Sequence, residues 1–330
     1  MRRVIWLILG VALLWSAWWG VATFGVARGI EGWLSARQTE GWQAETSAIT
    51  SGGYPKDIRV TVKDIALADP DTGAAVQASS LQVQAPVWDP GTVTLDLPKD
   101  PILLASPEGR SRLLMQKGQA RLAVTPTASL ALEQMEATAD AWLLDAEAGD
   151  ILAGGTSRLS VVQDPEMAAK YRFEMGIDAL RPGEVPRRAL YIPLDWPVTF
   201  DQFALNTTVI FDRSWDITAL EVSRPQPRQI VIHSAEAAWG ALQLRFAAAL
   251  DVDVQGTASG TLNVQARNWR SMLILAETSG ALRPQIEQAL STFAGLAGNP
   301  ETLDLALTLR GGTVFLGFLP LGPAPRLILR

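Results

Sequence analysis

The sequence contains no cysteine, a single histidine and no excess of basic residues. Without cysteine, no disulfide can stabilise the fold and no thiolate can bind a metal or act as a nucleophile. One histidine, His233, leaves no histidine cluster for a metal and no obvious catalytic triad, so we interpret it as a strand residue with ordinary hydrogen bonds. The net charge of −6 argues against a nucleic-acid partner, because phosphates require a clustered basic surface.

Catalytic motifs are also missing. The chain has neither a G-x-S-x-G nucleophile elbow nor a phosphate-binding loop. Asp69 and Asp71 lie in a Pro-Gly turn without the further oxygen ligands that a cation needs. Asp251 and Asp253 lie on the polar face of an expected strand, where charges are usually solvated. We therefore assign no catalytic, cofactor-binding or metal-binding residue, and we expect a protein that is not an enzyme.

A long uncharged segment, Val4 to Ala27, is the first strong feature that is present. At about 1.5 Å per helical residue it reaches roughly 36 Å, which is enough to cross a hydrocarbon core of about 30 Å. A cleaved secretory signal, the alternative, would have a shorter apolar core. The sequence thus predicts an uncleaved transmembrane signal anchor at residues 4–27.

The charges on either side of this segment predict its orientation. Arg2 and Arg3 precede it, whereas acidic residues dilute the arginines that follow it. Positive flanks stay in the cytoplasm, so residues 1–3 form a cytoplasmic stub and the rest is exported. In a Gram-negative cell this places the protein in the inner membrane as a single-pass protein, with the bulk of the chain in the periplasm.

The exported part is expected to be β-rich in two halves. Apolar residues at helical spacing predict that the helix continues as a stalk through residues 28–50. A first β-rich half, 51–182, is followed by a Pro-rich loop, 183–197, and a second half, 198–330. We interpret Arg187 and Arg188 as residues of an exposed loop. The alternative is that they bind anionic lipid headgroups or a partner protein.

Alternating apolar and polar residues predict the strands of the first half. The alternation begins at Ile58 and changes parity after Val62, which predicts a β-bulge near Lys63 or Asp64. A turn at 69–73 closes a hairpin. Shorter strands are expected at 80–87, 93–97, 111–116, 119–124 and 129–136, while 137–148 is ambiguous between strand and helix.

The second half holds the clearest strand, from Leu242 to Val254, which turns at Gly256 and Gly260 into a strand ending at Arg267. Two helices with start and stop signals follow at about 269–278 and 282–297, and the second has an apolar stripe that would pack on the sheet. Strands at 303–309 and 313–318 come last. The sequence predicts a mainly β (α+β) fold of long, curled antiparallel sheet. Its candidate apolar groove comprises Leu244, Phe246, Leu250 and Val252.

Several short motifs carry a resemblance to a known family. They are the N-terminal anchor, Gly53-Tyr54-Pro55, Asn268-Trp269-Arg270, and the stretch from Gly311-Gly312-Thr313-Val314 to Leu321-Gly322-Pro323-Ala324-Pro325. On these motifs nearly the whole chain resembles the uncharacterised alphaproteobacterial family catalogued as domain of unknown function 2125. More loosely it is similar to AsmA-type envelope proteins, a likeness that implies β-sheets curled into a groove and a link to outer-membrane lipid homeostasis.

Two functional hypotheses of different classes follow, with a third behind them. The first is a non-enzymatic envelope protein that binds lipid or another amphiphile in an apolar groove, beside the membrane bilayer. The second is a scaffold or adaptor that binds envelope proteins through sheet edges or the 183–197 loop. The third is a hydrolase with an unfamiliar site.

Overall fold

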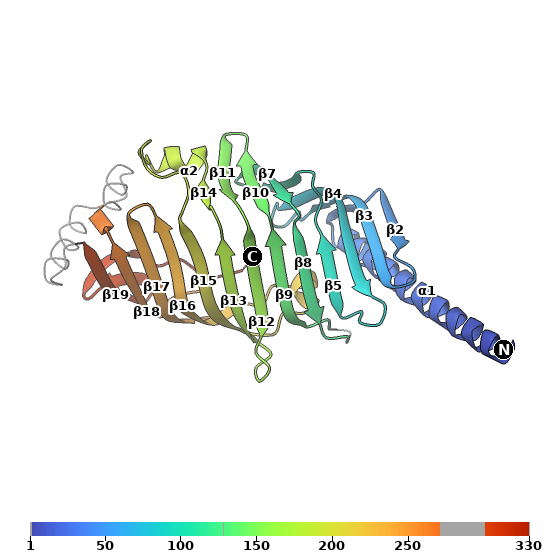
Figure 1. The fold of residues 1–330 in the computed structure, drawn as a ribbon. Helices are drawn as coiled ribbons and strands as arrows, with labels where there is room; N and C mark the ends of the chain where they lie inside the picture. Colours follow the sequence, from blue (N-terminus) through green and yellow to red (C-terminus); the bar gives the residue numbers. More distant parts are fainter. Residues whose placement is uncertain (1, 128, 271–300, 330) are drawn as a thin grey trace.

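The computed structural model describes residues 2–127, 129–270 and 301–329. Within these residues, 21 strands pair into one antiparallel sheet that extends away from a long N-terminal helix (Figure 1). The sheet is not a closed barrel. The expected mainly β fold with a curled sheet is confirmed.

The N-terminal helix, α1 (Arg2–Thr39), ends before residue 50, where the sequence predicts the end of the helical stalk. It ends where Gly41 adopts a positive φ of 91°, with the amide of Gly41 bonded to the Gln38 carbonyl and that of Trp42 to the Arg37 carbonyl. This glycine-centred pattern is a Schellman motif, which stops a helix. Strands β1 (Gln43–Glu45) and β2 (Ala48–Gly52) occupy the remainder of the expected stalk.

Strands β3 (Asp57–Ala68) and β4 (Ala75–Pro86) form the expected hairpin around the turn at 69–73. The predicted bulge is wrong, although the change of parity is real. Asp64 has a left-handed φ of 50°, while Lys63 and Ile65 on either side keep the same register with β4. Both strands change parity together at this kink, so no residue needs to be inserted.

The sheet forks at β4. The end of β4 pairs with β5 (Thr92–Asp96), and its beginning pairs with β6 (Ile102–Ser106). From β6 a short branch continues through β7 (Gly109–Gln116), β10 (Ala141–Ala146), β11 (Gly149–Gly154) and β14 (Arg181–Pro182).

The main branch continues from β5 across the rest of the molecule. In spatial order it contains β8 (Gln119–Val124), β9 (Leu132–Ala139), β12 (Ser157–Gln163), β13 (Lys170–Ile177), β15 (Gln202–Phe211), β16 (Pro227–Trp239), β17 (Leu242–Val252), β18 (Ala258–Arg267), β19 (Thr302–Arg310), β20 (Thr313–Leu316) and β21 (Leu319–Pro323). The chain crosses between the branches several times, and one crossing, at residue 140, lies in the stretch that the sequence leaves ambiguous between strand and helix.

The Pro-rich segment 183–197 contains a short helix, α2 (Glu184–Ala189), above one edge of the short branch (Figure 1). The guanidinium of Arg187 donates hydrogen bonds to the carbonyls of Pro193, Trp196 and Pro197, so the segment folds around this side chain. Strands β13 and β15 pair directly, and the main branch therefore passes this segment without a break. The expected helices at 269–278 and 282–297 lie outside the described residues, apart from Trp269 and Arg270.

A buried core in the main branch is built on Tyr171, which is fully buried with Val161, Val209 and Phe211. Its hydroxyl donates to the Leu132 carbonyl and accepts hydrogen bonds from the Trp215 amide and the Gln163 side chain. Burial raises the pKa of the Tyr171 phenol, so the group stays neutral. This hydroxyl therefore holds segment 212–226, which contains α3 (Thr218–Glu221), against the sheet.

We predict that Tyr171→Phe lowers the free energy of unfolding by about 1–3 kcal/mol, because it leaves the partly buried Trp215 amide without its acceptor. Amide hydrogen exchange in segment 212–226 should become faster. Tyr191→Phe is the matched control, since Tyr191 is largely exposed and should leave both measurements unchanged. A Tyr171→Phe variant as stable as the parent protein would contradict this role.

Candidate functional site

The candidate groove lies on one face of the main branch. Phe246 on β17 pairs with Ala235 on β16 and with Val264 on β18. Residues that are paired across strands point to the same face of a sheet, so the pairs can be followed from strand to strand. The resulting row is apolar at every position: Val60, Val83, Leu95, Ala120, Ala137, Leu159, Met175, Leu205, Ala235, Phe246, Val264 and Leu305.

A parallel row on the same face is almost as apolar, with one threonine. It contains Val93, Leu122, Met135, Val161, Phe173, Thr207, Ile232, Ala248, Leu262 and Leu307. We call this side of the main branch the apolar face.

The opposite face is polar. Its corresponding row contains Gln82, Asp96, Gln119, Thr138, Arg158, Gly176, Ala204, Glu236, Arg245, Gln265 and Asp304. Cross-strand hydrogen bonds such as Arg245 to Glu236 (3.0 Å) run along it. The sheet is therefore two-sided in the manner of an antiparallel sheet with one solvated face.

Three elements cover parts of the apolar face. At the far end, Leu316 of β20 and Leu321 of β21 pack in the core cluster with Ala266, Trp269 and Leu303. In the middle, Trp215 from segment 212–226 packs on the Tyr171 core. Near β8 and β9 the short branch lies over it. Between Val60 and the far end, the members of the first row remain only half-buried.

A cavity of about 330 Å³ lies between the two branches. The short branch contributes Leu113, Met115 and Trp142, and the main branch contributes Ala120, Ala137 and Leu159 among others. The indole N–H of Trp142 donates to the Ser157 hydroxyl at 2.7 Å, and this hydroxyl donates to the Gly155 carbonyl, so the polar atoms at the edge are satisfied. The lining is almost entirely apolar, and the volume is at the lower end of the range for ligand pockets.

The four residues predicted for the groove all lie on the apolar face, but they differ in accessibility. Val252 is 5% exposed and belongs to the buried core. Leu244 packs against the core cluster beneath β20 and β21. Phe246 and Leu250 are half-buried outside that cluster. The cavity itself is lined by residues that the sequence analysis did not single out, because their strands are short and meet only through the fork.

His233 occupies a β-bulge. Between Ile232 and Ala235 the register shifts relative to both β15 and β17, and His233 is the residue passed over in the pairing with β15. Its Nε2 lies 2.8 Å from the Thr208 hydroxyl on the exposed face. The bulge changes the parity of β16, so that Ile232 and Ala235 both face the apolar side.

The other polar candidates have structural partners. Asp69 accepts hydrogen bonds from the Thr72 hydroxyl and the Asp71 amide, and the Thr72 bond lowers the pKa of Asp69. The Asp253 carboxylate accepts hydrogen bonds from the amides of Gln255 and Thr257 in the β17–β18 turn. The described ranges contain no cluster of three His, Cys, Asp or Glu side chains that could hold a metal ion.

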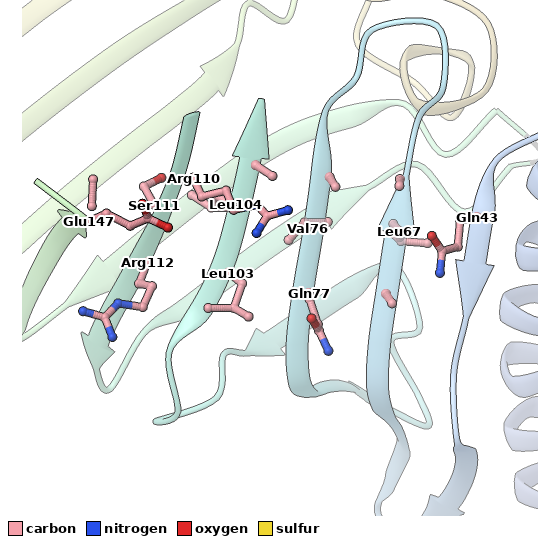
Figure 2. A pocket seen from close by; sticks show the side chains of 15 residues that line it. Gln43, Leu67, Val76, Gln77, Leu103, Leu104, Arg110, Ser111, Arg112 and Glu147 are labelled. Atoms are coloured by element: carbon pink, nitrogen blue, oxygen red, sulfur yellow. The ribbon is translucent and has the colours of Figure 1, made fainter. Parts of the chain in front are cut away.

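A second hollow, of about 700 Å³, lies over β1, β3, β4, β6 and β7 close to α1 (Figure 2). Its lining is mixed, with Leu67 and Val76 beside Gln77, Arg110 and Arg112. Arg112 forms a two-pronged ion pair with Asp145, at 2.5 and 3.1 Å. Because polar groups interrupt this surface, it is a poorer candidate for an apolar ligand than the cavity between the branches.

Comparison with known proteins adds one match. A family model described as "Uncharacterized protein conserved in bacteria (DUF2125)" matches residues 19–325. No curated protein and no solved structure matches the chain. The resemblance expected from the short motifs is confirmed, whereas the looser likeness to AsmA-type proteins gains no support.

We predict that an uncharged apolar fluorophore, N-phenyl-1-naphthylamine, binds the cavity and that Ala137→Trp weakens its binding about ten-fold, or roughly 1.4 kcal/mol. The added indole fills the cavity from the main-branch wall. Glu136→Trp is the matched control, because this adjacent side chain is exposed on the polar face. Equal binding by both folded variants, measured by fluorescence titration, would contradict the cavity as the binding place.

Proposed function

The chain belongs to the uncharacterised bacterial family DUF2125, and we propose that it is a membrane-anchored, non-enzymatic protein that holds a lipid or another amphiphile on the apolar face of its sheet. The proposal places it in the inner membrane of a Gram-negative cell, with its N-terminus in the cytoplasm and its sheet in the periplasm. Its role there would be in maintaining the envelope.

The anchor rests on α1. This helix is long and apolar enough to cross a membrane, and the residues of its apolar window are not buried against the sheet. Its N-terminal part projects away from the sheet (Figure 1). Arg2 and Arg3 at its start support the cytoplasmic orientation. A signal sequence would pass the same test of length and composition, so uncleaved anchoring is part of the proposal.

The observation that carries the proposal is the continuous apolar row from Val60 on β3 to Leu305 on β19. It crosses twelve strands, and at about 4.8 Å between strands it extends roughly 50 Å. This exceeds the thickness of one bilayer leaflet, about 15 Å, so an extended acyl chain fits along it. Each methylene buried there would contribute about 0.8 kcal/mol.

The chemistry of the cavity supports binding over catalysis. Two hydroxyl residues, Thr138 and Ser157, line it, and the Ser157 oxygen already accepts a hydrogen bond from the Trp142 indole and donates one to the Gly155 carbonyl. No carboxylate or histidine lines the cavity within the described residues. A bound apolar chain would meet hydrocarbon on both walls, which suits holding a ligand.

A scaffold or adaptor function has one observation in its favour. The segment that follows α2 presents Leu190, Tyr191 and Leu194 to solvent, and Leu194 is fully exposed. Exposed apolar residues grouped on one loop suit a protein partner. Crosslinking in cells to an envelope protein from a photoreactive residue in place of Tyr191, lost when Leu194→Asp is added, would favour this second function.

We predict that benzoylphenylalanine in place of Phe246 in the full chain crosslinks to lipid in cell membranes, because Phe246 is half-buried on the apolar face. The matched position is Gln243 on the same strand, which is exposed and points to the polar face. Mass spectrometry of the adducts should find lipid at position 246 and little at 243. Equal labelling at the two positions, or only protein adducts at 246, would shift the function to the scaffold.

A further inference from the structure

Three tryptophans in the middle of α1 bind the sheet domain at its nearest corner. The indole N–H of Trp15 donates to the Pro55 carbonyl at 2.8 Å, and that of Trp19 donates to the Asp57 carbonyl at 2.7 Å. The indole of Trp18 points to the Val87 carbonyl at 3.4 Å. The corner is formed by residues 53–57, from the end of β2 to the first residue of β3, and by residues 87–88, after β4. We call these residues the tip.

Further contacts fix the tip at the same level of the helix. The hydroxyls of Ser16 and Tyr54 lie 2.9 Å apart, and the rings of Trp19 and Tyr54 meet edge to face at 5.3 Å. Within the tip, the Asp57 amide donates to the Gly53 carbonyl and the Val87 amide donates to the Lys56 carbonyl. The tip is therefore held against α1 between positions 15 and 19.

Helix geometry places these positions below the membrane surface. If the hydrocarbon core begins at Val4, Trp15 lies about 17 Å and Trp19 about 23 Å along the helix. A core of about 30 Å ends near Thr23, so the tip lies roughly 7–13 Å inside the hydrocarbon of the far leaflet. If the tip lay outside the hydrocarbon, the core would have to end at Trp15 and only about 17 Å of apolar helix would span it. Thinning a bilayer by so much is unfavourable.

The composition of the tip suits that depth. Tyr54 is 56% exposed and Trp88 is 66% exposed, and such amphipathic rings favour the boundary between headgroups and acyl chains. Backbone groups in hydrocarbon need internal partners, and in the tip the Pro55 and Asp57 carbonyls accept hydrogen bonds from indoles while the Gly53 and Lys56 carbonyls accept them from amides of the tip. Lys56 is exposed and long enough to extend its ammonium toward the headgroups.

We propose that the tip, with Tyr54 and Trp88 on its surface, is embedded in the outer leaflet of the bilayer that α1 crosses. This inference rests on the proposed anchoring by α1. The partner is the phospholipid layer itself. Val60, the first residue of the apolar row, lies three residues after Asp57 on β3, so the apolar face begins next to the leaflet.

The absence of cysteine allows a clean test, because one introduced cysteine carries the only nitroxide label. The full chain is reconstituted in phosphatidylethanolamine–phosphatidylglycerol vesicles with a label at Trp88→Cys, and separately at Tyr54→Cys. Leu14→Cys on the helix is the lipid reference. Val254→Cys, 72% exposed in the β17–β18 turn at the far part of the sheet, is the aqueous reference.

Electron paramagnetic resonance then compares the accessibility of each label to oxygen and to a water-soluble nickel complex. We expect the oxygen-to-nickel ratio at positions 54 and 88 to be several-fold higher than at 254 and to approach that at 14. A lipid signal at 14 with aqueous signals at 54 and 88 would overturn the embedded tip and leave the anchor intact. Aqueous signals at all four positions would overturn both. Trp88 makes no contact with α1 in the described hydrogen bonds, so Trp88→Cys should fold even where Tyr54→Cys does not.

Discussion

The structure depends on the main branch of the sheet, which is apolar on one face and polar on the other from β3 to β19. A slip of one residue would move every side chain of a strand to the wrong face, so register must be maintained from strand to strand. Two local devices do this. At Asp64 the β3–β4 hairpin kinks without losing register, and at His233 an extra residue changes the parity of β16. The bulge at His233, the only histidine of the chain, thus keeps the apolar row continuous across β16.

Sequence patterns predict the parts of this sheet that depend on neighbouring residues. The alternation from Leu242 defines β17, and the change of parity in β3 after Val62 is visible in the sequence. The pattern could not distinguish a kink from a bulge, because that depends on the partner strand. The end of α1 at Thr39 was missed because the Schellman glycine, Gly41, follows residues that continue the helical spacing.

The fork and the cavity could not be predicted, because they depend on pairings between strands far apart in the sequence. Strand β4 divides its length between β5 and β6, and the chain changes branches between β9 and β10. Local alternation fixes which face of a short strand is apolar, as for Ala137 and Leu159. It does not fix which branch lies opposite, and this opposition creates the cavity. Residues predicted from the longest strand, such as Val252, are accordingly in the packed core.

The elements that cover the apolar face connect it to α1. Arg37, near the end of α1, is buried and donates to the Glu221 carbonyl in α3 at 3.0 Å. Segment 212–226, which contains α3, is fastened at its other side by Tyr171. The same helix therefore holds the near corner of the sheet through its tryptophans and the cover of the middle of the sheet through Arg37. In the proposed anchored protein, a change in the tilt of α1 relative to the sheet would act on both places, because the same helix contacts both.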